Sequence, residues 1–122
     1  MADGKSIGID LGTTNTVMFL MHTAPQAILN RESEQLTPSV VALKKGKKTG
    51  DTLLVGKRAQ EHALYAGKNY LYSVKRLMGR GYDDKDVQKM KENVSYEIVP
   101  SPHGDEDVVR VTLDNKLYEA KE

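Results

Sequence analysis

The first thirty residues carry short apolar stretches, and in the first of these stretches apolar positions alternate with small or polar ones at the period of two that is typical of β-strands. Apolar side chains at 7, 9 and 11 alternate with small or polar ones, and an apolar run follows at 17–21. Between them stands the polar tetrapeptide Gly12-Thr13-Thr14-Asn15. This spacing predicts a β-hairpin, with a third strand at 26–29 that extends it into an antiparallel meander.

A boundary is expected at Leu36-Thr37-Pro38-Ser39. Pro38 biases Thr37 toward an extended conformation and cannot donate to a central ladder. Beyond it, apolar stretches at 39–43 and 52–55 predict two strands joined by the lysine-rich segment 44–51. This segment contains no aromatic side chain that could stack on a base, so we interpret it as a solvated loop rather than a nucleic-acid patch.

Helical spacing replaces the strand pattern between residues 56 and 94. We predict helices from Gly56 to a C-cap at Gly67, from 69 to 78, and from an N-cap at Asp83 or Asp84 onward. Their apolar or half-buried positions are Ala59, His62, Ala63 and Ala66; Leu71, Val74, Leu77 and Met78; and Val87, Met90 and Val94.

Extended structure resumes in the last quarter of the chain. Strands are predicted at 96–99 and 108–113, on either side of a loop at 100–106. Asp114-Asn115 suits a tight turn before a final strand at 116–118.

Composition narrows the possible functions. Eighteen basic and seventeen acidic residues give a formal net charge of +1, so no overall field favours nucleic acid or acidic lipid as a partner. The chain has no cysteine, and its three histidines are widely spaced, which argues against thiol chemistry and a local metal site. No apolar run is long enough to span a bilayer. We therefore expect a cytoplasmic protein of about one domain.

The first hairpin carries the candidate chemistry. Gly12 permits a backbone geometry in which successive amides converge on an anionic oxygen, and Thr13 and Thr14 add hydroxyl donors. Asp10, at the end of the first strand, would repel a phosphate unless Mg²⁺, held largely through water, lay between them. A phosphate-binding turn is thus one hypothesis, and an ordinary polar hairpin turn is the other.

The order of several motifs resembles one family. Gly8-Ile9-Asp10-Leu11-Gly12-Thr13-Thr14-Asn15 is followed by Leu36-Thr37-Pro38-Ser39-Val40-Val41, by Leu54-Val55-Gly56 and by Val74-Lys75-Arg76-Leu77-Met78-Gly79-Arg80. This series is similar to the start of the DnaK-type heat-shock chaperones over nearly the whole chain. The Lys-Arg-Leu-x-Gly-Arg element separates this family from actins and sugar kinases, which share the first hairpin.

The resemblance implies a mixed α/β chain that forms part of an actin-like, ribonuclease H-like ATPase fold. Residues 1–37 would begin the lower subdomain of the first lobe, 38–117 would form its small upper subdomain, and 118–122 would return to the lower one. Two departures, Ser33-Glu34-Gln35 and Ala66-Gly67, stand where the family commonly has Gly-Asn-Arg and Asn-Pro. Neither touches the implied phosphate contacts.

The resemblance also implies roles for individual residues. Asp10 would approach Mg²⁺ through water; Gly12, Thr13, Thr14 and Asn15 would bind the phosphates of ATP or ADP; and Lys75 would reach the γ-phosphate as the catalytic residue. From periodicity alone, Lys75 is a solvated lysine at a helix edge.

The implied whole protein couples ATP hydrolysis to binding and release of unfolded polypeptides, with a J-domain co-chaperone and a nucleotide exchange factor as partners. Most of an ATP site is missing from these residues, so we expect the 122-residue chain alone to be inactive and to self-associate through its uncovered hairpin. An actin-like or sugar-kinase-like phosphotransferase and an interaction module without nucleotide are the alternatives.

Overall fold

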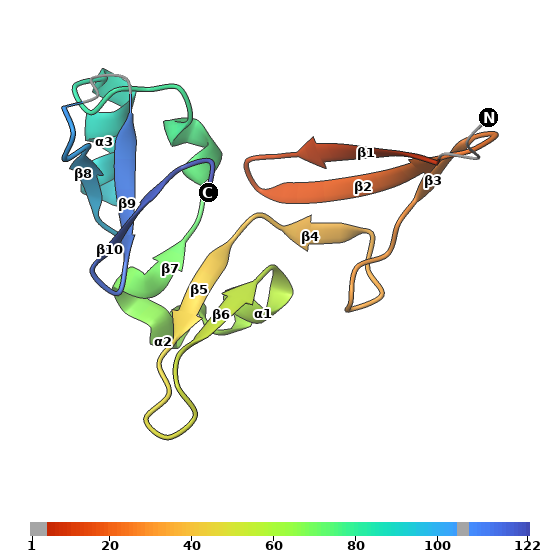
Figure 1. Cartoon of the computed structure of the whole chain (residues 1–122), viewed down its shortest axis with the longest axis horizontal. Coiled ribbons are helices and arrows are strands. Elements are labelled where there is room, and N and C mark those ends of the chain that lie inside the picture. Colours follow the sequence, from red (N-terminus) through yellow and green to blue (C-terminus); the bar gives the residue numbers. More distant parts are fainter. Residues whose placement is uncertain (1–4, 105–107) are drawn as a thin grey trace.

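The computed structural model describes residues 5–104 and 108–122 (Figure 1). Within these ranges the chain forms three antiparallel sheets with short helices between and against them, so the mixed α/β class expected from the sequence is confirmed. Residues 105 and 106 of the predicted loop 100–106 lie outside the described residues, as does residue 107, which precedes the predicted strand 108–113. No helix in the described ranges has the length and apolarity needed to cross a membrane.

The first sheet contains the predicted hairpin. Strand β1 (Ser6–Leu11) pairs along its whole length with β2 (Asn15–Met21), while β3 (Pro25–Ala27) and β4 (Leu36–Pro38) pair with the other edge of β2. The third strand is therefore shorter and earlier than 26–29. Strand β4 was not predicted, and it tolerates Pro38 because that residue is its last and lies at an edge.

This hairpin is poorly covered. The cross-strand register places Ile7 and Ile9 opposite Leu20 and Met18, and puts Phe19 on the other face. Ile7 and Ile9 remain 61% and 64% exposed, and every residue of β1 is exposed. Figure 1 shows β1 and β2 extending away from the rest of the molecule. The described core thus lies elsewhere.

The second sheet has the order β6-β5-β7, with β5 (Val41–Lys44), β6 (Thr52–Val55) and β7 (Tyr70–Leu71). Helix α1 (Lys57–Glu61) covers it and helps to enclose a small core of Val40, Ala42 and Ala59. The continuous helix predicted for 56–66 is wrong, because His62 (φ −88°, ψ −2°) separates α1 from α2 (Ala63–Ala66). His62 is half-buried as expected, whereas Leu64 is 93% exposed.

The helix predicted for 69–78 is also wrong. After the 3₁₀ turn η1 (Gly67–Asn69), residues 70–71 pair with β5, and Ser73 then adopts a left-handed conformation with φ +55°. A second 3₁₀ turn, η2 (Val74–Leu77), follows. Pairing with β5 buries Leu71 and satisfies its backbone, so this long-range contact overrides the local helical spacing.

The main core lies between α3 and the third sheet. Helix α3 (Lys85–Asn93) packs against β8 (Ile98–Pro100) and β9 (Val109–Leu113), with β10 (Lys116–Glu119) at the far edge of the sheet (Figure 1). The largest fully buried side chains are Leu77, Val87, Ile98, Val109 and Val111.

Two local predictions are confirmed in this part of the chain. The Asp84 side chain caps α3 by accepting from the Asp86 amide at 2.8 Å. Asp114 and Asn115 both have positive φ, as a tight hairpin turn between β9 and β10 requires.

Candidate functional site

The turn between β1 and β2 is closed by its own backbone. The Gly12 N–H donates to the Asn15 carbonyl at 2.9 Å, and a Cβ at position 12 would lie 2.3 Å from that oxygen. Glycine is therefore required for the shape of the turn, and its amide is already used. The amides of Thr13 and Thr14 make no hydrogen bond with the residues that the structure describes. These two amides and the threonine hydroxyls are the donors that the turn can offer to an anion.

Ser39 ties this turn to the start of the second sheet. Its N–H donates to the Thr14 carbonyl at 2.8 Å, and its hydroxyl lies 2.8 Å from the Thr16 hydroxyl. Neither Ser39 nor Thr16 was among the predicted site residues. The contact depends on β4 pairing with β2, a strand that the sequence pattern did not reveal, so only the Thr-Pro-Ser motif itself could have pointed to Ser39.

Lys75 reaches the same turn from η2. Its ammonium group donates to the Leu11 carbonyl at 2.7 Å, although the two residues are 64 positions apart in sequence. Leu11 immediately precedes Gly12, so the ammonium charge lies at the entrance to the turn. The structure therefore brings together two parts of the predicted site that the sequence left far apart.

A cavity of about 520 Å³ opens beside this contact. Gly12, Thr13 and Lys75 line it, together with the unpredicted Thr16 and Ser39. The remaining lining residues are mostly apolar and come from the second and third sheets and from the end of the chain. Thr14 and Asn15 do not line it, so the cavity collects only part of the predicted phosphate set.

Asp10 lies on the other side of its strand. Successive side chains of a strand point to opposite faces, and the adjacent Leu11 lines the cavity whereas Asp10 does not. Asp10 is exposed, and no group of three or more histidine, aspartate or glutamate side chains in the described ranges could hold a metal ion. The described residues fit a phosphate group through amides, hydroxyls and an ammonium. Asp10 stands next to the turn but does not line the cavity, so it would hold Mg²⁺ only through water.

Glu119 also lines the cavity. Its carboxylate pairs with Lys121 and with Arg110, each at 3.1 Å. Lys121, helped by Arg110, lowers the pKa of the Glu119 carboxyl. Because two cations compensate this carboxylate, it does not cancel the positive charge of Lys75 at the turn.

The family model described as Hsp70 protein matches residues 6–122. Two relatives, one from each of two strains of Thermus thermophilus, are both named chaperone protein DnaK. Each is 38% identical to this chain over 119 residues. The match covers 97% of this chain but 18% of either relative, so the chain spans less than a fifth of their length. The chain belongs to the Hsp70 protein family.

Proposed function

We propose that these residues form the N-terminal part of the ATPase domain of a DnaK-type chaperone. The observation that carries this proposal is the contact of the Lys75 ammonium with the Leu11 carbonyl, 2.7 Å away, at the edge of the β1–β2 turn. It places a cation beside a turn in which Thr13 lines the same cavity and the Thr13 and Thr14 amides make no hydrogen bond with the described residues. Family membership removes the actin-like and sugar-kinase alternatives that the hairpin alone left open.

In this proposal the β1–β2 turn and Lys75 bind different parts of the phosphate chain. The Thr13 and Thr14 amides and hydroxyls bind phosphate oxygens, and Lys75 exchanges the Leu11 carbonyl for the γ-phosphate. Asp10 would hold Mg²⁺ through water, and Gly12 and Asn15 keep the turn closed. Bound Mg-ATP supplies the phosphoryl group for transfer to water. Lys75 then stabilises the negative charge at the transferring group, since positioning and electrostatics dominate this chemistry.

The wider function follows the same proposal. Residues 1–37 begin the lower subdomain of the first lobe, 38–117 form the upper subdomain, and 118–122 return to the lower one. The whole protein couples ATP hydrolysis to binding and release of unfolded polypeptides in the cytoplasm, assisted by a J-domain co-chaperone and an exchange factor. The match covers 18% of the DnaK relatives, and in this proposal the adenosine and the client are bound by other parts of the protein.

Calorimetry with Mg-ATP tests the proposal. Two proteins are titrated: the 122-residue chain, and a chimera in which residues 6–122 replace the matching segment of Thermus thermophilus DnaK. We expect the chimera to bind Mg-ATP and a Thr13→Val variant to bind about tenfold more weakly, because one hydroxyl contact is lost. Thr49→Val, in the loop between β5 and β6, is the matched control. A folded chimera that does not bind nucleotide would contradict the proposal and favour an interaction module.

A further inference from the structure

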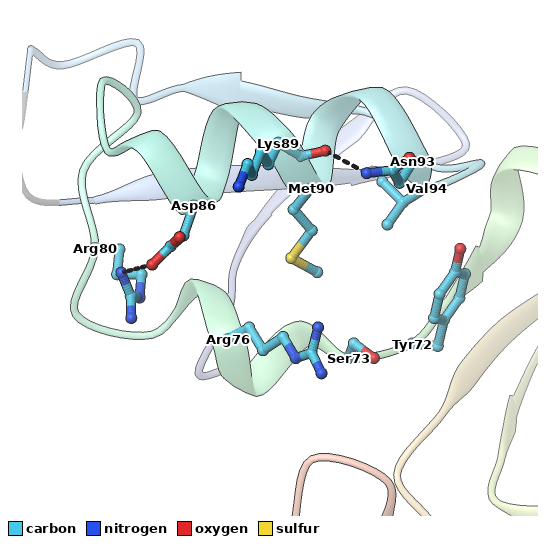
Figure 2. A pocket seen from close by; sticks show the side chains of 9 residues that line it. All are labelled: Tyr72, Ser73, Arg76, Arg80, Asp86, Lys89, Met90, Asn93 and Val94. Atoms are coloured by element: carbon cyan, nitrogen blue, oxygen red, sulfur yellow. Dashed lines mark hydrogen bonds and ion pairs between the residues drawn. The ribbon is translucent and has the colours of Figure 1, made fainter.

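A second cavity, of about 600 Å³, lies between η2 and α3 (Figure 2). None of the predicted phosphate-site residues lines it. Lys75 and Arg76 are consecutive, yet Lys75 contacts the first hairpin whereas Arg76 lines this second cavity. The two cavities therefore lie on different sides of η2, and the second has no part in the proposed phosphate chemistry.

The floor of this cavity is apolar. Tyr72, Met90 and Val94 are half-buried and pack against the main core. Figure 2 shows Met90 pointing from α3 toward the segment that carries Ser73 and Arg76. Tyr72 is fixed by an edge-to-face contact with Tyr96 at 5.5 Å and by the Tyr96 hydroxyl, which donates to the Tyr72 carbonyl at 2.7 Å. A rigid ring beside a flexible thioether makes a floor that can adapt to an inserted apolar side chain.

The rim of the cavity carries uncompensated positive charge. Arg80 is paired with Asp84 and Asp86, at 3.1 Å and 3.0 Å, so these three side chains together carry a net charge of −1, and Arg76 and Lys89 bring the group to a net +1. Arg76 on η2 and Lys89 on α3 are exposed, and neither side chain has a carboxylate partner among the described residues. Two free cations thus stand on opposite walls above the apolar floor.

We propose that this cavity is a docking site for an acidic peptide segment of a partner protein. One apolar side chain of that segment sits on Tyr72, Met90 and Val94, and its carboxylates contact Arg76 and Lys89. We choose an acidic partner because its carboxylates complement the positive charge of Arg76 and Lys89. A small anion is disfavoured because both cations are exposed to water, where single ion pairs contribute little. A peptide instead combines several carboxylates with burial of an apolar side chain.

Fluorescence anisotropy on the 122-residue chain tests the proposal. The probe is a labelled synthetic peptide with one phenylalanine between glutamates. We expect binding that weakens as salt rises, and a loss of about tenfold or more in the Arg76→Gln, Lys89→Gln double variant. Lys85→Gln, an exposed lysine of α3 outside the cavity, is the matched control and should bind within about twofold of the unmodified chain.

Additional measurements distinguish an acidic peptide from other ligands of this cavity. A peptide with alanine in place of phenylalanine, and one with lysines in place of glutamates, should both bind more weakly. The proposal is overturned if either binds equally well, if the double variant binds like the unmodified chain while circular dichroism shows it folded, or if citrate displaces the probe as effectively as unlabelled peptide. The last result identifies a small-anion site. Absence of binding up to about 1 mM peptide also overturns it.

Discussion

Lys75 and Arg76 show how much the direction of a single side chain matters. Both are exposed basic residues of one 3₁₀ turn, and sequence spacing alone does not distinguish their tasks. The Lys75 ammonium donates to the Leu11 carbonyl, whereas Arg76 faces α3. A carbonyl is a neutral acceptor that a phosphate oxygen can replace with a stronger, charge-assisted contact. The observed bond leaves Lys75 without an ion pair among the described residues, which is consistent with the proposed contact with a phosphate.

Replacement of Lys75 by alanine in the Thermus thermophilus DnaK chimera should slow hydrolysis while leaving nucleotide affinity largely intact. We expect single-turnover hydrolysis to fall by about a hundredfold or more, since the contact strengthens as charge develops in the transition state. Rapid-quench kinetics and calorimetry measure the two quantities separately.

The matched control for this change is Lys68→Ala, which removes an exposed lysine paired with Glu97 at 3.3 Å. It should leave both quantities nearly unchanged. Equal single-turnover rates with and without Lys75 would remove that residue from the mechanism.

At the scale of elements, helix α3 depends on one of two adjacent aspartates. Asp84 accepts from the Asp86 amide and faces Arg80, whereas Asp83 is exposed and makes no hydrogen bond or ion pair with the described residues. The Asp86 amide, with help from Arg80, lowers the pKa of the Asp84 carboxyl. A lowered pKa means that the charged form is favoured in the folded state. Its contribution is present above the usual carboxyl pKa and is lost as the pH falls through the folded-state value.

Asp84→Ala should lower the thermal midpoint by about 5 °C near neutral pH, because the cap of α3 is lost. Asp84→Asn should retain most of the stability, because asparagine also caps helices, but should lose the pH dependence that the carboxyl contributes. Thermal unfolding by circular dichroism at pH 7 and at pH 3 measures both effects. Asp83→Ala, the matched control, should change the thermal midpoint little. If it lowered the midpoint as much as Asp84→Ala, the assignment of Asp84 as the cap would be wrong.

At the scale of the whole molecule, the first sheet is uncovered and the main core is not. Ile7, Ile9 and Phe19 are exposed on the two faces of the hairpin, while the large side chains between α3 and the third sheet are fully buried. Strand β1 also has an unpaired edge within the described sheet. Apolar faces and unpaired backbone groups on such a strand recruit further strands.

We therefore expect the 122-residue chain to self-associate through this hairpin as its concentration rises. Ile9→Lys should weaken association by about tenfold, because it removes apolar area and places a charge on the edge strand. Leu64→Lys is the matched control: Leu64 is 93% exposed but lies on α2, away from the hairpin. Sedimentation velocity measures association. A strictly monomeric chain whose β1 amides are protected in hydrogen exchange would contradict this prediction.

The 122-residue chain alone should show no ATP turnover above that of its own Lys75→Ala variant. The described residues supply one side of a phosphate site, and the match covers 18% of the DnaK relatives. A phosphate-release assay with Mg-ATP measures turnover, with the chimera as the positive control. If the 122-residue chain hydrolysed ATP and its Lys75→Ala variant did not, the chain alone would be a catalyst and the prediction would be wrong.

The sequence by itself determined the features that depend on near neighbours. Alternation and an apolar run predicted β1 and β2, and the adjacent Asp114 and Asn115 predicted the β9–β10 turn. The pair Asp83-Asp84 predicted an N-cap for α3, which Asp84 supplies. The run of motifs from Gly8 to Arg80 indicated the family that the comparisons then showed. In each case the decisive interactions join residues close in sequence, so local spacing carries the information.

Only the tertiary structure decided the features that depend on distant partners. Residues 70–71 form a strand because β5 is available to pair with them, although their spacing favours a helix. The contacts of Ser39 with the first hairpin require β4 to pair with β2. The direction of Lys75 is set by a residue 64 positions away. Pairing and burial across such separations outweigh local propensity, and no short window of sequence contains both partners.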